Sequence, residues 1–231
     1  MNEDKAALQD FNGSARLFPL PNLVFFPHSL QPLHIFEPRY RELAADAIAG
    51  DKLISIVLLQ PGWEKQYEQK PSIYPVACIG RIVADQLLPD GRYNLLLRGI
   101  GRVRIIEEVP TEKLYRRAHA EIVPDRCEAP LEIVMELRKQ LEERILPRFS
   151  EGHVSKQLGD LFHSELPLGA LCDILTFSLP VPIEWKQMML EELHEDIRAN
   201  MLLEGFDMIA PPNVGIVGNP NRKFPPDFSS N

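Results

Sequence analysis

The stretch YPVACIGRIVADQLLPDGRYNLLLRGIGRVRIIEE, residues 74–108, decides the fold. Branched apolar residues recur along it at short intervals, which is typical of β-strands. Pro89-Asp90-Gly91 is a strong turn signal, so the segments on its two sides are expected to form a hairpin. The chain then passes through Gly99-Ile100-Gly101 into a further strand, Arg102–Glu108. Residues 74–108 therefore predict an antiparallel β-structure.

Further short strands are expected on both sides of this hairpin, at Leu17–Leu20, Leu23–Phe26, Leu53–Leu59 and Ala118–Val123. One helix interrupts them. Glu37-Pro38 places proline in a first helical turn, and Gly50 ends the helix after Ala49. Several short strands with one early helix predict a small, partly closed barrel.

Beyond Pro124 the apolar residues recur with a helical period, and helices are expected at residues 130–146, 154–163, 168–179 and 182–204. The chain is therefore predicted to be α+β, with a barrel subdomain over 16–125 and a helical subdomain over 126–206. The polar residues 1–15 and the Pro/Gly/Asn-rich tail, 207–231, are expected to be disordered.

Composition narrows the class of protein. The formal net charge of −8 argues against nucleic acid as a partner. The longest apolar run, LISIVLL at residues 53–59, is too short to span a bilayer, and the first residues do not read as a signal peptide. Three cysteines without close spacing favour reduced thiols. A cytoplasmic protein without a membrane segment is expected.

Several motifs resemble those of the amino-terminal, substrate-binding domain of the Lon protease family. LFPLPNLVFFP at 17–27 and QPLHIFEPRYR at 31–41 are similar to that domain's opening strands and first helix. CIGRI at 78–82 and LRGIGRVRI at 97–105 resemble its later strands. LCDIL at 171–175 and EWKQMMLE at 184–191 resemble its helical half.

This resemblance covers about Arg16 to Gly205, and the form IFEPRY is similar to short bacterial relatives that consist of this domain alone. It implies a PUA-like β pseudo-barrel followed by a small helical bundle. It also implies a module that binds unfolded or extended polypeptide, or a protein partner, in an adaptor or chaperone-like role. The oligomeric state stays open.

The motifs of catalysis are missing from the sequence. There is no Gly-Lys dipeptide, so a phosphate-binding P-loop cannot form, and there is no Gly-x-Ser-x-Gly elbow. His194-Glu195 begins a zinc motif, but Arg198 stands where the second histidine is required. We therefore expect no catalytic residues, no metal and no cofactor, and we expect that the protein is not an enzyme.

Aromatic and charged residues suggest where a polypeptide would bind. Most of the aromatic residues Phe18, Phe25, Phe26, Phe36 and Tyr40 are expected in the core. Trp63 and Tyr67 instead lie in a polar loop, residues 62–72, where exposure favours contact with a ligand. Glu37, Arg39 and Arg41, at the start of the early helix, would add selection by charge. Packing of Trp63 on the barrel is the simpler alternative.

The alternative function is RNA binding. Arg98, Arg102 and Arg104 share strand parity if the extended pattern continues through residues 99–101. They would then form a stripe on one face of the sheet, as an RNA-binding PUA-like protein could use. The acidic total charge and the neighbouring Glu107 and Glu108 argue against this function.

Overall fold

The computed structural model describes residues 2–66, 70–149 and 153–206. The chain divides after Val123 into two compact units, a barrel unit and a helical unit. The described strands all lie in the barrel unit, as the change of apolar period predicts, and the division falls two residues before the expected position at 125. The predicted tail at 207–231 lies outside the described residues.

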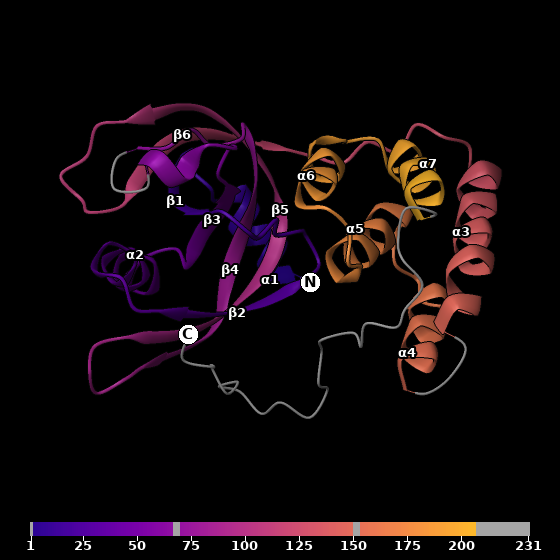
Figure 1. Cartoon of the computed structure of the whole chain (residues 1–231), viewed down its shortest axis with the longest axis horizontal. Coiled ribbons are helices and arrows are strands. Elements are labelled where there is room, and N and C mark those ends of the chain that lie inside the picture. Colours follow the sequence, from indigo (N-terminus) through magenta and orange to yellow (C-terminus); the bar gives the residue numbers. More distant parts are fainter. Residues whose placement is uncertain (1, 67–69, 150–152, 207–231) are drawn as a thin grey trace. The chain divides into compact units, whose positions relative to one another are not determined.

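Five strands of the barrel unit close into a ring, in the order β1-β3-β4-β5-β6 and back to β1 (Figure 1). The β1–β3 pair is parallel, and the other pairs are antiparallel. The sixth strand, β2, pairs with the first half of β5 and lies outside the ring. The described elements are α1 (Asn2–Gln9), β1 (Ser14–Leu20), β2 (Leu30–Ile35), α2 (Pro38–Ala49), β3 (Leu53–Leu58), η1 (Trp63–Gln66), β4 (Val76–Leu87), β5 (Tyr93–Val109) and β6 (Arg116–Val123).

A pair of glycines lets one loop lie flat on the barrel. Gly80 in β4 stands opposite Gly99 in β5. A Cβ atom at Gly99 would lie 2.0 Å from the carbonyl oxygen of Phe26, and one at Gly80 would lie 2.8 Å from the ring of Phe25. The prediction of a strand at Leu23–Phe26 is therefore wrong. This segment is irregular and packs across the two glycines, because Pro21 and Pro27 at its ends have no N–H for a ladder.

The amino-terminal residues are ordered by contacts that the sequence does not reveal. Residues 2–9 form α1 instead of a disordered segment, and β1 begins at Ser14. Asp4 of α1 accepts a hydrogen bond from Nε of Arg81 at 2.8 Å. Leu8 packs against the apolar core of the barrel. The prediction of disorder over residues 1–15 fails because this short helix has both an ionic and an apolar anchor.

The early helix, α2, forms as the sequence predicts. Proline stands in its first turn, and at its carboxyl end the backbone N–H of Gly50 donates to the carbonyl oxygen of Ala47. The apolar face that the helical period places inward is buried, and consists of Tyr40, Leu43, Ala44 and Ala47. This face holds the start of α2, which follows β2 directly, in a fixed position on the barrel.

The helical unit contains α3 (Leu131–Ile145), η2 (Leu146–Phe149), α4 (His153–Phe162), α5 (Leu168–Ser178), α6 (Ile183–Glu191) and α7 (Glu195–Gly205). The prediction of a single helix over 182–204 is wrong, since the structure has two helices there, α6 and α7, separated by a short non-helical segment. His194 is extended there and forms a bridge with Arg126. The carbonyl of Glu192 accepts a hydrogen bond from Arg198 instead of continuing the helix.

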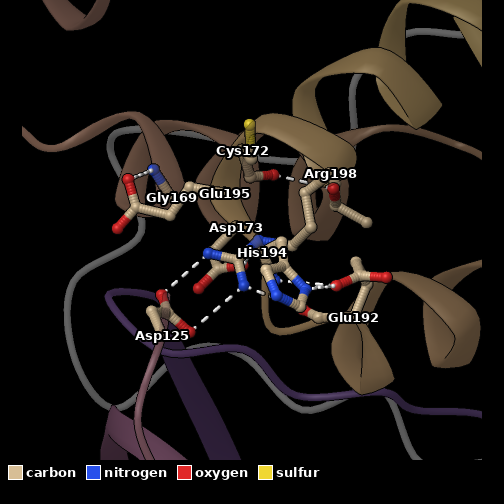
Figure 2. Close-up of polar contacts among 9 residues, drawn as sticks. Asp125, Gly169, Cys172, Asp173, Glu192, His194, Glu195 and Arg198 are labelled. Atoms are coloured by element: carbon tan, nitrogen blue, oxygen red, sulfur yellow. Dashed lines mark hydrogen bonds and ion pairs between the residues drawn. The ribbon is translucent and has the colours of Figure 1, made fainter. Parts of the chain in front are cut away.

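A buried arginine joins three segments of the helical unit (Figure 2). The Arg198 side chain is 0% exposed, and its two terminal nitrogens donate to the carboxylate of Asp125 at 3.1 and 2.7 Å. Its Nε lies 3.6 Å from the buried carboxylate of Asp173, an ion-pair distance too long for a hydrogen bond. Burial alone would lower the pKa of Arg198, but the charges of Asp173 and Asp125 outweigh burial and raise it. The cluster therefore ties α5 and α7 to the segment after β6.

No helix within the described ranges combines the length and the apolar character that a bilayer crossing requires. The same ranges contain no group of three or more His, Cys, Asp or Glu side chains placed to hold a metal ion.

Candidate functional site

The edge strand β2 presents apolar side chains to solvent. Among the described strands, it lies at the end of the sheet order and pairs on one side, with β5. Leu33 and Ile35 point into the core, whereas Leu30 is 50% exposed and Phe36, directly after the strand, is 60% exposed. Most of the aromatic residues between Phe18 and Tyr40 were expected in the core, and Phe36 is an exception. The alternation of side chains along β2 turns it outward.

A chain of polar contacts holds this edge in place. Arginine can only donate, so the 3.2 Å contact from Nη1 of Arg92 makes Nε2 of His34 an acceptor. Nδ1 of His34 then carries the proton and donates to Oδ1 of Asn94 at 2.8 Å. Asp90 binds Arg92 from the other side. Both ring nitrogens of His34 are thus held by neighbouring side chains, and its ring lies 6.3 Å from the ring of Phe36.

A cavity of about 270 Å³ opens beside the start of α2. It is lined by the beginning of α2, by the end of the loop before β4, and by the connection from β5 to β6. Among its described lining residues are five cations and one carboxylate, Glu108. The five cations are Arg39, Lys70, Lys113, Arg116 and Arg117. We call this the cationic pocket.

Three of the five cations are paired. Arg39 binds Glu37 at 2.8 Å, and its guanidinium lies 4.6 Å from the ring centre of Tyr40. Arg116 forms an ion pair with Glu108 and donates to the carbonyl of Pro71 at 2.8 Å.

Lys113, the third paired cation, binds Asp46 at 2.8 Å. This contact holds the pKa of Asp46 below its usual value, although partial burial acts in the opposite direction. Tyr115 donates to the same carboxylate at 2.9 Å. Burial raises the pKa of Tyr115, and the hydrogen bond to Asp46 adds to the effect, so the phenol remains protonated at neutral pH.

The other two cations, Lys70 and Arg117, form no ion pair within the described part of the chain. Lys70 is exposed. Arg117 donates from Nη2 to the Ser14 hydroxyl at 2.7 Å, whereas its buried Nε has no hydrogen-bond acceptor. The pocket therefore keeps positive charge that its own carboxylates do not neutralise.

The structure brings together some of the predicted site residues and separates others. Arg39 lines the cationic pocket and is held by Glu37. The guanidinium of Arg41 instead covers Gly91, since a Cβ there would lie 2.2 Å from its Nη2. Trp63 is half-buried in η1, and Tyr67 lies outside the described residues.

The arginine stripe expected for RNA binding does not form. A β-bulge at Ile100 shifts the register of β5 between Gly99 and Gly101. Arg98 consequently pairs with Arg81, and Arg102 with Cys78, which lie on opposite faces of β4. Arg102 is buried, and Arg98 forms an ion pair with Asp4 at 3.4 Å. Shared strand parity therefore holds for Arg102 and Arg104, which pair with Cys78 and Val76, but it fails for Arg98, because the expectation assumed an unbroken strand.

Sequence reasoning missed most of the cationic pocket. The run KLYRR at residues 113–117 could have indicated an anion-binding site, since it places three cations within five residues at the start of β6. Only the fold brings this run beside Arg39 and Lys70, which lie far from it in sequence.

Comparison with known proteins gives one consistent result. The family model described as "ATP-dependent protease La (LON) substrate-binding domain" matches residues 14–205. The chain is similar to Lon protease of Anaeromyxobacter dehalogenans, with 27% identity over 199 residues, and to Lon protease of Dictyoglomus thermophilum, with 28% over 193 residues. These alignments cover 85% and 80% of this chain but 23% of each relative. The chain thus spans less than a quarter of the length of these relatives.

Two solved structures share the fold. The Lon N-terminal domain protein from Xanthomonas campestris superposes with a TM-score of 0.60 and 22% identity, covering 83% of this chain and 97% of that one. The N-terminal domain of the Mycobacterium avium complex Lon protease gives a TM-score of 0.66 and 16% identity, covering 83% and 96%. The fold expected from the sequence motifs is confirmed.

Proposed function

Because this chain belongs to the family of ATP-dependent protease La (LON) substrate-binding domains, we propose that it binds extended polypeptide along the edge strand β2. One observation carries the proposal. Within the described residues, β2 has an unpaired edge, and the apolar side chains of Leu30 and Phe36 stand exposed at its two ends. The function proposed for this chain is binding rather than catalysis, as in an adaptor or a chaperone-like module.

The edge of a sheet can receive an extended chain as an added strand. Its free N–H and C=O groups bind the backbone of any sequence, which suits a protein that selects unfolded segments. Exposed apolar side chains then add affinity for apolar residues of the ligand. Pro32 in the middle of β2 has no N–H, and its carbonyl oxygen already accepts a hydrogen bond from Nε2 of Gln31 at 2.8 Å, so a ligand strand would pair with the other residues of β2.

The residues singled out from the sequence enter the proposal as flanking contacts. Arg41 lies over the turn between β4 and β5, and Leu87 near that turn is also exposed. Glu37 follows Phe36 directly in the chain, and Arg39, its ion-pair partner, follows Phe36 by three residues. Trp63, which is half-buried in η1, stays proposed as a further contact, and so does Tyr67, which lies outside the described residues.

Binding of a permanently unfolded, alkylated model protein, followed by fluorescence anisotropy, tests this proposal. Phe36→Ser should weaken binding about thirtyfold, as expected for loss of an aromatic anchor worth about 2 kcal/mol. Its thermal unfolding should change little, because the ring is mostly exposed. The matched control is Ile106→Ser, which removes another exposed apolar side chain from the barrel unit, away from β2.

Hydrogen exchange supplies a second readout. If a ligand adds as a strand, amides of residues 30–35 should exchange more slowly in its presence. Unchanged affinity of Phe36→Ser, or equal losses for Phe36→Ser and Ile106→Ser, would show that the edge strand is not the site.

A further inference from the structure

The cationic pocket stands out in a protein whose formal charge is −8. We propose that this pocket binds a carboxylate of the polypeptide held at β2, either an acidic side chain or a free carboxyl terminus. The inference rests on the proposed function and adds a selection rule to it. Extended segments with an acidic group beside their apolar residues should be preferred.

The charges around the pocket favour an anion. Outside the lining, Glu37 pairs with Arg39, and both Asp46 and Glu42 lie at ion-pair distance from Lys113, at 2.8 and 3.5 Å; within the lining, Glu108 pairs with Arg116. Lys70 and Arg117 remain without a carboxylate partner among the described residues. An entering carboxylate would therefore meet a net positive field in a partly desolvated space, where charge pairs are stronger than in water.

The donors of the pocket match the acceptors of a carboxylate. Arg117 is a lining residue of the cavity, and its buried Nε has no acceptor among the described residues, whereas its Nη2 donates to Ser14. Planar guanidinium groups bind carboxylates in a fixed geometry, and a lysine adds a mobile charge. Thr111 adds a hydroxyl group to the same lining. The lining thus includes guanidinium, ammonium and hydroxyl groups, which can all donate hydrogen bonds to a small oxyanion.

The size of the pocket restricts its ligand. A volume of about 270 Å³ lies below the range of roughly 300–1,000 Å³ that is usual for sites of drug-sized molecules. It accommodates one acidic side chain or a chain end rather than a nucleotide. A group within a peptide is therefore the natural occupant.

The pocket is also within reach of the edge strand. Arg39 follows Phe36 by three residues, so their Cα atoms are separated by roughly 11 Å at most. A polypeptide that contacts Phe36 needs to extend only a few residues to place a carboxylate beside Arg39.

Isothermal titration with short valine-rich peptides tests the inference. One pair of peptides differs by a single aspartate or asparagine, and each is made with a free and an amidated carboxyl terminus. The acidic peptides should bind about fivefold more tightly than the neutral amides, and salt should reduce this preference. Whether the aspartate or the free terminus gives the preference distinguishes the two sources of the carboxylate.

Three variants connect the preference to the pocket. Lys70→Met should reduce it, and Lys70→Met with Arg117→Gln should abolish it while the neutral peptides bind as before. Lys65→Met is the matched control, because it removes an exposed lysine of the same loop that does not line the pocket. Thermal unfolding checks that each variant is folded, and Lys70→Met, a change of an exposed side chain, remains informative if Arg117→Gln unfolds the barrel.

The outcomes separate the two proposals. Equal binding of acidic and neutral peptides, or a preference that survives in the folded double variant, would overturn the carboxylate site and leave polypeptide binding intact. Competition by inorganic phosphate without any preference for acidic peptides would identify a free-anion site and would also overturn the inference. No binding of any peptide would remove both proposals.

Discussion

The buried arginine of the helical unit offers a sharp test of what holds that unit together. Arg198→Met keeps a long apolar side chain but removes the cation between Asp125 and Asp173. Asp173 is 0% exposed, so its carboxylate would remain buried and would lose its ion pair with Arg198. Asp125 is partly exposed and can be solvated by water.

The expected loss follows from this difference. Removing one partner of a buried ion pair typically costs about 3–5 kcal/mol, because the remaining charge is uncompensated. Replacing Asp173 as well, by asparagine, removes that charge. The double variant Arg198→Met with Asp173→Asn should therefore be more stable than Arg198→Met alone, by about 1–2 kcal/mol.

Each unit contains one of the two tryptophans, which makes the assay specific. In a Trp63→Phe background, fluorescence reports on Trp185 of α6, whose ring packs against Gly205 of α7. Urea titration then gives the free energy of unfolding of the helical unit. All variants are compared in this background.

Lys139→Met is the matched control. It breaks an ion pair with Glu143 in α3, where both side chains are about two-thirds exposed, at 65% and 66%. Its cost should be within about 0.5 kcal/mol. A loss below about 1 kcal/mol for Arg198→Met, or no recovery in the double variant, would refute the reasoning from the buried charge.

Three further predictions concern two residues of the barrel unit and one glycine of α4. Gly99→Ala should destabilise the barrel unit by about 3 kcal/mol in thermal or urea unfolding, because its Cβ would meet the backbone oxygen of Phe26. Gly159→Ala, with open space around its Cβ, should be neutral or slightly stabilising. Asp46→Asn should lower stability at pH 7. The pKa of Asp46 is depressed in the folded state, so its contribution is present above its unfolded pKa of about 4 and is lost as pH falls through the folded pKa. Urea titrations at several pH values should therefore show wild type and variant converging below about pH 4, and a constant gap would contradict the pairing with Lys113.

The sequence by itself determined the elements whose signals are local. Pro38 and Gly50 mark the two ends of α2, and Pro89-Asp90-Gly91 sets the turn between β4 and β5. The change from short strands to helical periodicity after Pro124 gave the α+β order and the division into two units. These features depend on backbone geometry and apolar period, which a few neighbouring residues are enough to specify.

Tertiary structure decided the features that depend on distant partners. The bulge at Ile100 places Arg98 on the opposite face from Arg102 and Arg104, and Arg102 is buried, so the expected stripe of three arginines does not form. Gly99 and Gly101 permit a bulge, but the pairing with β4 decides that it occurs. The segment Leu23–Phe26 reads as a strand, but it packs on glycines that lie far along the chain. Residues 1–15 read as disordered, yet Asp4 and Leu8 find partners on the barrel.

For the candidate sites too, the sequence shows the individual residues, but only the tertiary structure shows their arrangement. The charges of the cationic pocket were visible in the sequence as separate residues, whereas their convergence was not. Arg39, Lys70 and Arg117 meet because α2, a loop and the start of β6 fold against one another. The exposure of Phe36 was likewise set by the place of β2 at the edge of the sheet. Local sequence determines helix ends, turns and apolar periodicity. The burial of a side chain and its charge partners depend on which distant segments the packed fold brings together.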